Sequence, residues 1–142
     1  MSVVTDVADA VVAELNAASL SLSLESERHY VPIFDLAEMT ELHVSVVPRG
    51  MEITRTDRSR NKHDIQIDVA VQKKFEKGDT AEIDPLLDLV EEIADFFRLR
   101  RLASYPDAIW TKTKHDPIYA QEHWDELRQF TSIVTFTFRV VR

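Results

Sequence analysis

The longest run of regularly spaced apolar residues lies between Ile83 and Leu102, in the stretch IDPLLDLVEEIADFFRLRRL. Apolar residues recur there at intervals of three and four, which is the spacing of one face of an α-helix. We expect Asp84 to cap this helix and Pro85 to take its first position, where the missing N–H group costs nothing. The apolar positions are Leu86, Leu89, Val90, Ile93, Phe96 and Phe97. Such a face needs a sheet or another helix to cover it.

A second amphipathic helix is predicted for residues 3–17, with Ser2 or Thr5 as its cap. Its apolar face consists of Val4, Val7, Val11 and Leu15. Strict alternation of apolar and polar residues predicts strands elsewhere, because successive side chains of a strand point to opposite faces. The predicted strands are 19–24, 42–47, 64–72 and 131–141, with a short edge strand at 109–113.

The segments between these elements contain turn-forming residues and shorter patterns. Residues 25–40 form a predicted connector, in which Asp35 and Glu38 have the spacing of a capping box. After Pro48 the alternation resumes, which predicts either a hairpin or a bent strand pair in the region 42–53. A brief helix is expected at 121–129.

Four to five strands and two long helices predict an α+β fold. We expect a two-layer arrangement: a largely antiparallel or mixed sheet, with both helices on one face and a polar face opposite. A chain of 142 residues, with no internal repeat and no long linker, fits a single domain spanning 1–142.

The amino-acid composition limits the kinds of functional site that the chain can contain. The chain has no cysteine, which excludes disulfides, thiolate metal sites and cysteine nucleophiles. The N-terminal stretch carries acidic residues within its apolar pattern, so we expect neither a signal peptide nor a membrane span there. The net charge of −8 opposes extensive binding to nucleic acid, although it suits a surface past which DNA must slide.

No catalytic motif is present. The five histidines are scattered, and the two glycines exclude phosphate-cradling loops, so we expect no catalytic residue, metal or cofactor. One acidic helix side is compatible with a divalent cation: Asp88, Glu91, Glu92 and Asp95. Its simpler interpretation is a solvated face with Asp95 paired to Arg98. An enzyme remains an alternative, with His63, Asp68 and this acidic side as its best residues.

The strongest local departure from the acidic composition is residues 49–62, RGMEITRTDRSRNK. The basic residues of this segment are Arg49, Arg55, Arg58, Arg60 and Lys62. The segment is either a solvated loop between strands or a projecting tip that meets a neighbouring subunit, a partner or DNA phosphates. Trp110, Tyr119 and Trp124 cluster in a less regular segment, where aromatic residues either pack in the core or anchor an interface.

The order of these patterns resembles the tail terminator and neck proteins of tailed bacteriophages. The similarity covers nearly the whole chain, as pattern and order. It is carried by four stretches: YVPIFDLAEMTELHVSVVPRG, DIQIDVAVQKK, FFRLRRL and TFTFRVV. No individual residue matches a functional position of that group.

The resemblance implies a non-enzymatic structural protein of the virion, made in the host cytoplasm. Such a protein forms a ring, commonly of six copies, that caps the tail tube and joins it to the head while DNA passes through the lumen. Its expected partners are copies of itself, the tail tube protein and a head-side neck or connector protein, with no membrane. The alternative is a soluble adaptor that binds another protein without catalysis.

Overall fold

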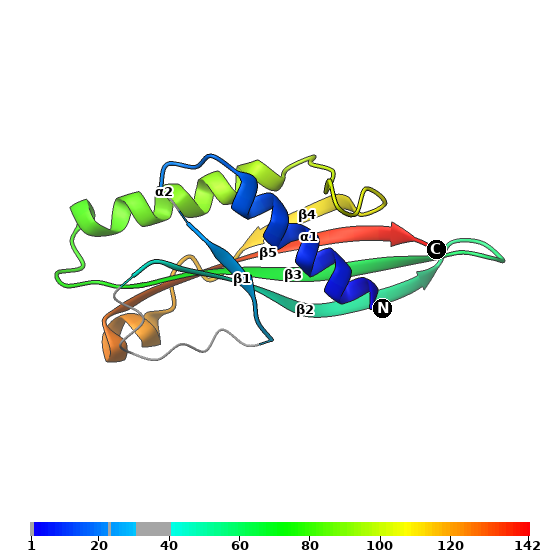
Figure 1. Cartoon of the computed structure of the whole chain (residues 1–142). Helices are drawn as coiled ribbons and strands as arrows, with labels where there is room; N and C mark the ends of the chain where they lie inside the picture. Colours follow the sequence, from blue (N-terminus) through cyan, green and yellow to red (C-terminus); the bar gives the residue numbers. More distant parts are fainter. Residues whose placement is uncertain (1, 23, 31–40) are drawn as a thin grey trace.

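A five-stranded sheet forms one layer of the fold, and two helices lie on one of its faces (Figure 1). The computed structural model describes residues 2–22, 24–30 and 41–142. The strands are β1 (Ser26–Arg28), β2 (His43–Arg55), β3 (Asn61–Lys74), β4 (Ile109–His115) and β5 (Gln129–Val141). Their order is β1-β2-β3-β5-β4, and all neighbours are antiparallel except β1 and β2. The predicted α+β class and mixed sheet are therefore confirmed.

The alternating patterns of β3 and β5 place their apolar residues opposite one another. Ile65 lies opposite Phe138, and Ile67 lies opposite Phe136. All four side chains are fully buried, and cross-strand pairs of aromatic and branched residues stabilise a sheet. Phe97 of helix α2 (Thr80–Phe97) packs onto this layer, with its ring centroid 4.8 Å from that of Phe136.

Helix α2 begins earlier and ends earlier than the sequence pattern predicts. Asp79, not Asp84, is its cap, and the Asp79 carboxylate accepts a hydrogen bond of 3.1 Å from the Glu82 N–H group. Pro85 consequently lies inside the helix, at an exposed position near its start. The helix stops at Phe97, and Leu99 adopts a left-handed conformation with φ of 60°. The pattern misplaced the start because residues 80–82 lack the apolar periodicity on which the prediction depended. It misplaced the end because Leu99 and Leu102 continue the apolar spacing beyond Phe97 although the chain has left the helix there.

Helix α1 (Val3–Ala17) matches its predicted range, and Ser2 is the cap. It is attached to the segment after α2 by Glu14, which is buried. The Glu14 carboxylate accepts hydrogen bonds from the Arg100 guanidinium, at 2.9 Å, and from the Ala103 N–H group, at 2.7 Å. Neither described helix combines the length and apolar character needed to cross a bilayer.

The strand predicted at 19–24 is wrong, because residues 19–22 and Leu24 form no strand. Leu20, Leu22 and Leu24 instead pack, partly buried, against the core. The alternation therefore arises from an irregular segment in which every second side chain contacts the core. The predicted connector contains the three residues of β1, which pair in parallel with Val44–Val46. The capping box of Asp35 and Glu38 lies outside the described residues.

The region after Pro48 is a bend within one strand. β2 continues to Arg55, and its register against β3 shifts between Pro48 and Gly50. The predicted brief helix is a single π-helical segment, η2 (His123–Leu127). η2 lies beside the sheet face opposite α1 and α2 (Figure 1), where the His123 Nδ1 atom is 2.8 Å from the Thr131 hydroxyl.

The sheet face opposite the helices is polar in composition, as predicted, but one end of it is buried. Four polar residues on this face have at most 5% of their surface exposed: Ser45, Gln72, Thr131 and Thr135. Polar composition therefore does not make this end of the sheet a solvated face.

Candidate interface site

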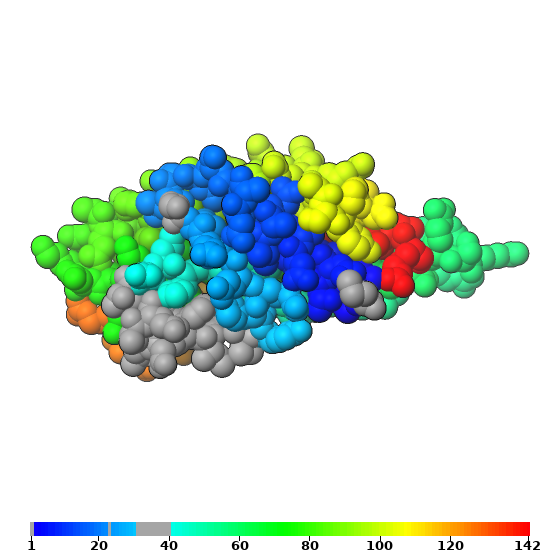
Figure 2. All heavy atoms as spheres, viewed as in Figure 1, coloured from blue at the N-terminus to red at the C-terminus, as the bar shows by residue number. Residues whose placement is uncertain are grey.

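The predicted basic segment lies on the hairpin between β2 and β3. We call residues 51–62 the arm. Its turn projects beyond the helices at one end of the molecule, where it forms a narrow extension in both views (Figures 1 and 2). Within the described residues, β1 pairs only with Val44–Val46, so the outer edge of β2 along the arm has no neighbouring strand.

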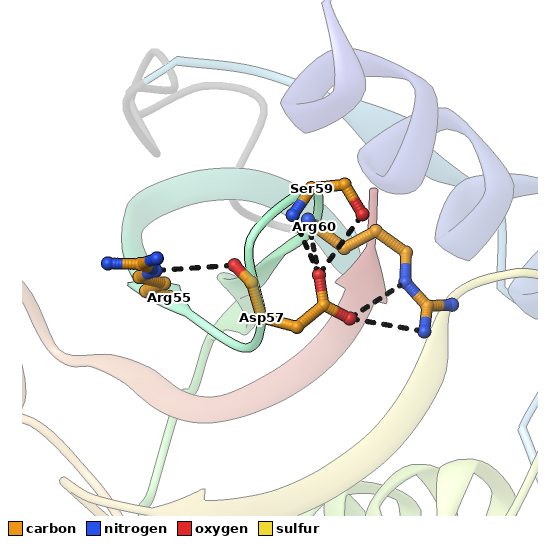
Figure 3. Close-up of polar contacts among 4 residues, drawn as sticks. All are labelled: Arg55, Asp57, Ser59 and Arg60. Atoms are coloured by element: carbon orange, nitrogen blue, oxygen red, sulfur yellow. Dashed lines mark hydrogen bonds and ion pairs between the residues drawn. The ribbon is translucent and has the colours of Figure 1, made fainter.

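Asp57 organises the turn of the arm (Figure 3). Its carboxylate accepts hydrogen bonds of 2.8 Å from the N–H groups of Ser59 and Arg60, and it forms an ion pair of 3.3 Å with the Arg60 guanidinium. Hydrogen bonds from these two N–H groups lower the pKa of Asp57. The positive charge of Arg60 is thus neutralised by Asp57 within the turn.

Three cations of the arm remain available to a partner. Within the described residues, no carboxylate lies within ion-pair distance of Arg55, Arg58 or Lys62. Arg55 donates a hydrogen bond of 3.3 Å to the carbonyl oxygen of Asp57 (Figure 3), which neutralises no charge. All three residues lie at or next to the turn: Arg55 pairs with Asn61, Lys62 pairs with Thr54, and Arg58 lies in the turn itself. Arg55 and Lys62 are attached to opposite faces of the hairpin, so the tip presents positive charge on both faces.

Arg49 is not part of this cluster. It lies at the bend of β2, where its guanidinium is 3.3 Å from the Thr135 hydroxyl and 3.8 Å from the Asp68 carboxylate. Thr135 in turn donates a hydrogen bond of 2.6 Å to Asp68. The basic residues of the segment 49–62 therefore do not form one cluster: Arg49 contacts the sheet, whereas the others lie near the turn of the arm.

The arm also carries apolar surface. Met51 lies opposite Ile65, so it belongs to the helix-covered face of the sheet, but it is 45% exposed. Ile53 lies opposite His63 on the same face and is 52% exposed. The helices do not extend over this part of the sheet, so these two side chains form an uncovered apolar row beside the cationic tip.

Trp110 and Trp124 are both partly buried, and the structure places them apart. Trp110 lies on β4 and donates a hydrogen bond of 2.7 Å to the Thr113 hydroxyl. Trp124 lies on η2, with its ring centroid 4.5 Å from Phe75 and 5.1 Å from Tyr119. Each tryptophan packs against the core of its own chain.

The residues proposed for an enzyme do not converge. His63 lies on the helix-covered face of β3, whereas Asp68 lies on the opposite face, since their positions differ by an odd number. His115 is 2.6 Å from the Ser132 hydroxyl, and burial lowers its pKa. Among the described residues, no three histidine or carboxylate side chains form a group that could hold a metal ion.

The acidic side of α2 borders an open hollow of about 490 Å³. Asp88, Glu91, Glu92 and Asp95 form one wall, and Ser21, Leu22 and Pro85 complete the lining. We call these seven residues the acidic groove. Sequence patterns did not indicate it, because Ser21 and Leu22 are distant from α2 in the chain. The contact is held by Glu92, which accepts hydrogen bonds from the N–H group and the hydroxyl of Ser21.

The acidic groove is largely unneutralised. Within the described residues, Asp88, Glu91 and Asp95 form no ion pair, so the predicted pair of Asp95 with Arg98 is absent. Helix α2 carries six carboxylates and no lysine or arginine: Glu82, Asp84, Asp88, Glu91, Glu92 and Asp95. The molecule therefore has a strongly acidic surface and a separate basic tip.

Comparison with solved structures connects this fold to a tail-like machine. The chain is similar to the sheath/tube terminator of the PVC extracellular contractile injection system in its extended state. The TM-score is 0.51 at 16% sequence identity, over 100% of this chain and 57% of the terminator chain. The chain thus has the fold expected from its resemblance to tail terminators, and it spans just over half the length of this relative. No protein-family model and no curated protein matches the sequence.

Proposed function

We propose that this protein is a non-enzymatic terminator of a phage-like tail, a structural component that caps the tail tube. The observation that carries the proposal is the similarity of the entire chain to a sheath/tube terminator. The separation of His63 from Asp68 supports a structural role, because general acid–base chemistry needs its groups within hydrogen-bond reach of one substrate.

The cap is a ring of identical copies, six in number as in the tail terminators that this chain resembles. A stable contact between copies buries more than about 1,000 Å² in total. Arg55, Arg58, Arg60 and Lys62 on the arm serve this assembly, with Arg49 supporting the bend at its base. Trp110 and Trp124 have partly exposed surfaces and are further interface candidates.

The completed ring joins the tube to a head-side neck or connector protein in the virion. DNA passes through its lumen as cargo. The net charge of −8 supports this step, because an acidic wall repels phosphate and does not retain the passing DNA.

The direct test is electron microscopy of tail tubes, polymerised from the tube protein encoded with this chain, in the presence and absence of the purified protein. We expect ring-shaped density at one end of each tube, and tubes whose growth stops when the protein is added. Tubes with bare ends and undiminished growth at saturating protein would refute the proposal.

A further inference from the structure

The strongest unexplained feature is the pairing of a basic, partly apolar arm with an acidic groove in one chain. The arm offers three cations without ion-pair partners, and the groove offers three carboxylates in the same condition. Opposite charges that met within one chain would neutralise each other, but the fold keeps these two sets apart. Helix α2 begins at the end of the molecule opposite the arm (Figure 1).

We infer that the arm of one copy docks into the acidic groove of the next copy. Arg55, Arg58 and Lys62 would face the carboxylates of α2 there. Complementary charges of this kind orient two surfaces and suppress other partners, because like charges brought together are unfavourable.

Apolar surface on both sides supports the same pairing. Met51 and Ile53 are about half exposed on the arm, and Leu22 and Pro85 line the groove together with its carboxylates. An interface with apolar contacts at its centre and charges at its rim has the usual anatomy of a specific protein contact. DNA, the other acidic partner available to the tip, offers no comparable apolar surface along its phosphate backbone.

The separation of the two surfaces determines the type of assembly. An arm that binds a groove on a different part of the next copy makes a head-to-tail contact. Repeating such a contact closes into a ring when the rotation between copies permits it. The inference rests on the proposed function, because both require that copies of the chain associate. It adds the identity of the two surfaces that meet.

The test exchanges the charges. The arm variant is Arg55→Glu with Arg58→Glu, and the groove variant is Asp88→Lys with Glu91→Lys; all four side chains are exposed. Each variant alone should weaken self-association about tenfold in sedimentation velocity, whereas all four changes in one chain should restore it. The matched control is Glu122→Lys, at the N-cap of η2, with Glu126→Lys on η2; both side chains are exposed, and neither residue lines the groove. Circular dichroism and thermal melting verify the fold of each variant.

A crosslinking experiment can detect the contact even if self-association is too weak for sedimentation velocity. Because the chain has no cysteine, Ile53→Cys in one sample and Asp88→Cys in another place single thiols on the arm and in the groove. Mixing them at high concentration with a short bifunctional thiol reagent should yield the mixed dimer in excess over either homodimer. Lys112→Cys on β4 serves as the control partner for Ile53→Cys.

Two results would overturn the inference: unchanged association in both charge variants, or crosslinking of Ile53→Cys to Lys112→Cys as efficient as to Asp88→Cys. If rings still cap tubes in the microscope in that case, the proposed function stands and only the assignment of the surfaces fails. Bare tube ends together with efficient arm-to-groove crosslinking would instead refute the proposed function and leave the assignment of the surfaces intact.

Discussion

Glu14 is the buried carboxylate that links α1 to the segment after α2. Burial alone would raise its pKa, but the hydrogen bonds from the Ala103 N–H group and the Arg100 guanidinium lower it below the ordinary value of 4.5. We predict that Glu14→Gln lowers the free energy of unfolding by about 1–2 kcal/mol at neutral pH, because a charge-assisted acceptor is lost. Urea denaturation measures this difference, and Glu122→Gln, at an exposed site, should change stability by less than about 0.5 kcal/mol.

The same residue predicts a pH dependence. A carboxylate with a lowered pKa in the folded state contributes stability that is fully present above its unfolded pKa. That contribution is lost as the pH falls through the folded pKa. The stability difference between wild type and Glu14→Gln should therefore be largest above pH 4.5 and should shrink at lower pH. A difference that stays constant down to about pH 3 would contradict this account of Glu14.

The two glycines should respond differently to substitution by alanine. Gly78 has a φ of +69°, and an added Cβ would lie 2.9 Å from the Phe75 ring and 3.3 Å from Trp124. We expect Gly78→Ala to lower the free energy of unfolding by about 2–3 kcal/mol, from backbone strain and overpacking. In Gly50→Ala the nearest atom lies at an ordinary 3.6 Å, so its thermal midpoint should stay close to that of wild type. Equal midpoints for the two variants would exclude this explanation.

At the scale of single residues, the sequence located the basic segment but did not predict the partners of its charges. The basic character of residues 49–62 is evident from composition alone. The structure pairs Arg49 with Asp68, and Arg60 with Asp57. The first contact depends on the register shift at Pro48 and Gly50, and the second depends on the conformation of a turn. Neither is encoded in a periodic pattern.

At the scale of elements, prediction succeeded where burial on one face imposes a period. β3 and β5 alternate because each presents one side to the helices, and that constraint is local in sequence. The failure at 19–24 has the same origin. Leu20, Leu22 and Leu24 contact the core at intervals of two, yet the described residues of this segment pair with no strand. Alternation of apolar and polar residues indicates that every second side chain is buried. A β-strand also needs a neighbouring strand to which its backbone can form hydrogen bonds.

The apolar row of the arm gives an element-scale prediction. Met51→Thr with Ile53→Thr keeps residues that suit a strand and removes the uncovered apolar surface. If this row is buried between copies, each change removes on the order of 1 kcal/mol of burial, so self-association should weaken by about tenfold or more in sedimentation velocity. The thermal midpoint should change little, because both side chains are about half exposed.

The control for the apolar row is Ile118→Thr, which alters a side chain that is 54% exposed and lies outside the arm. Its association should equal that of wild type. Equal weakening by Ile118→Thr would indicate a general loss of surface hydrophobicity, and it would exclude a specific role for the arm.

At the scale of the whole molecule, the distribution of charge could not be predicted from the sequence. Composition gives a net charge of −8 and a basic segment, but the distance between that segment and α2 follows from the topology. β2 and β3 carry the arm to one end of the sheet, while the chain after β3 turns back to start α2 at the other end (Figure 1). The two surfaces therefore cannot satisfy each other within one copy.

This geometry makes a prediction about stoichiometry. A chain with Arg55→Ser, Arg58→Ser and Lys62→Ser, together with Met51→Thr and Ile53→Thr, keeps the turn held by Asp57 and retains only the groove. The groove variant, Asp88→Lys with Glu91→Lys, retains only the arm. Each copy in a mixture of the two then has one functional surface, so a head-to-tail contact forms once and cannot propagate. Native mass spectrometry should detect a one-to-one dimer in the mixture and monomers in each sample alone. Rings or longer chains in the mixture would show that copies associate through other surfaces.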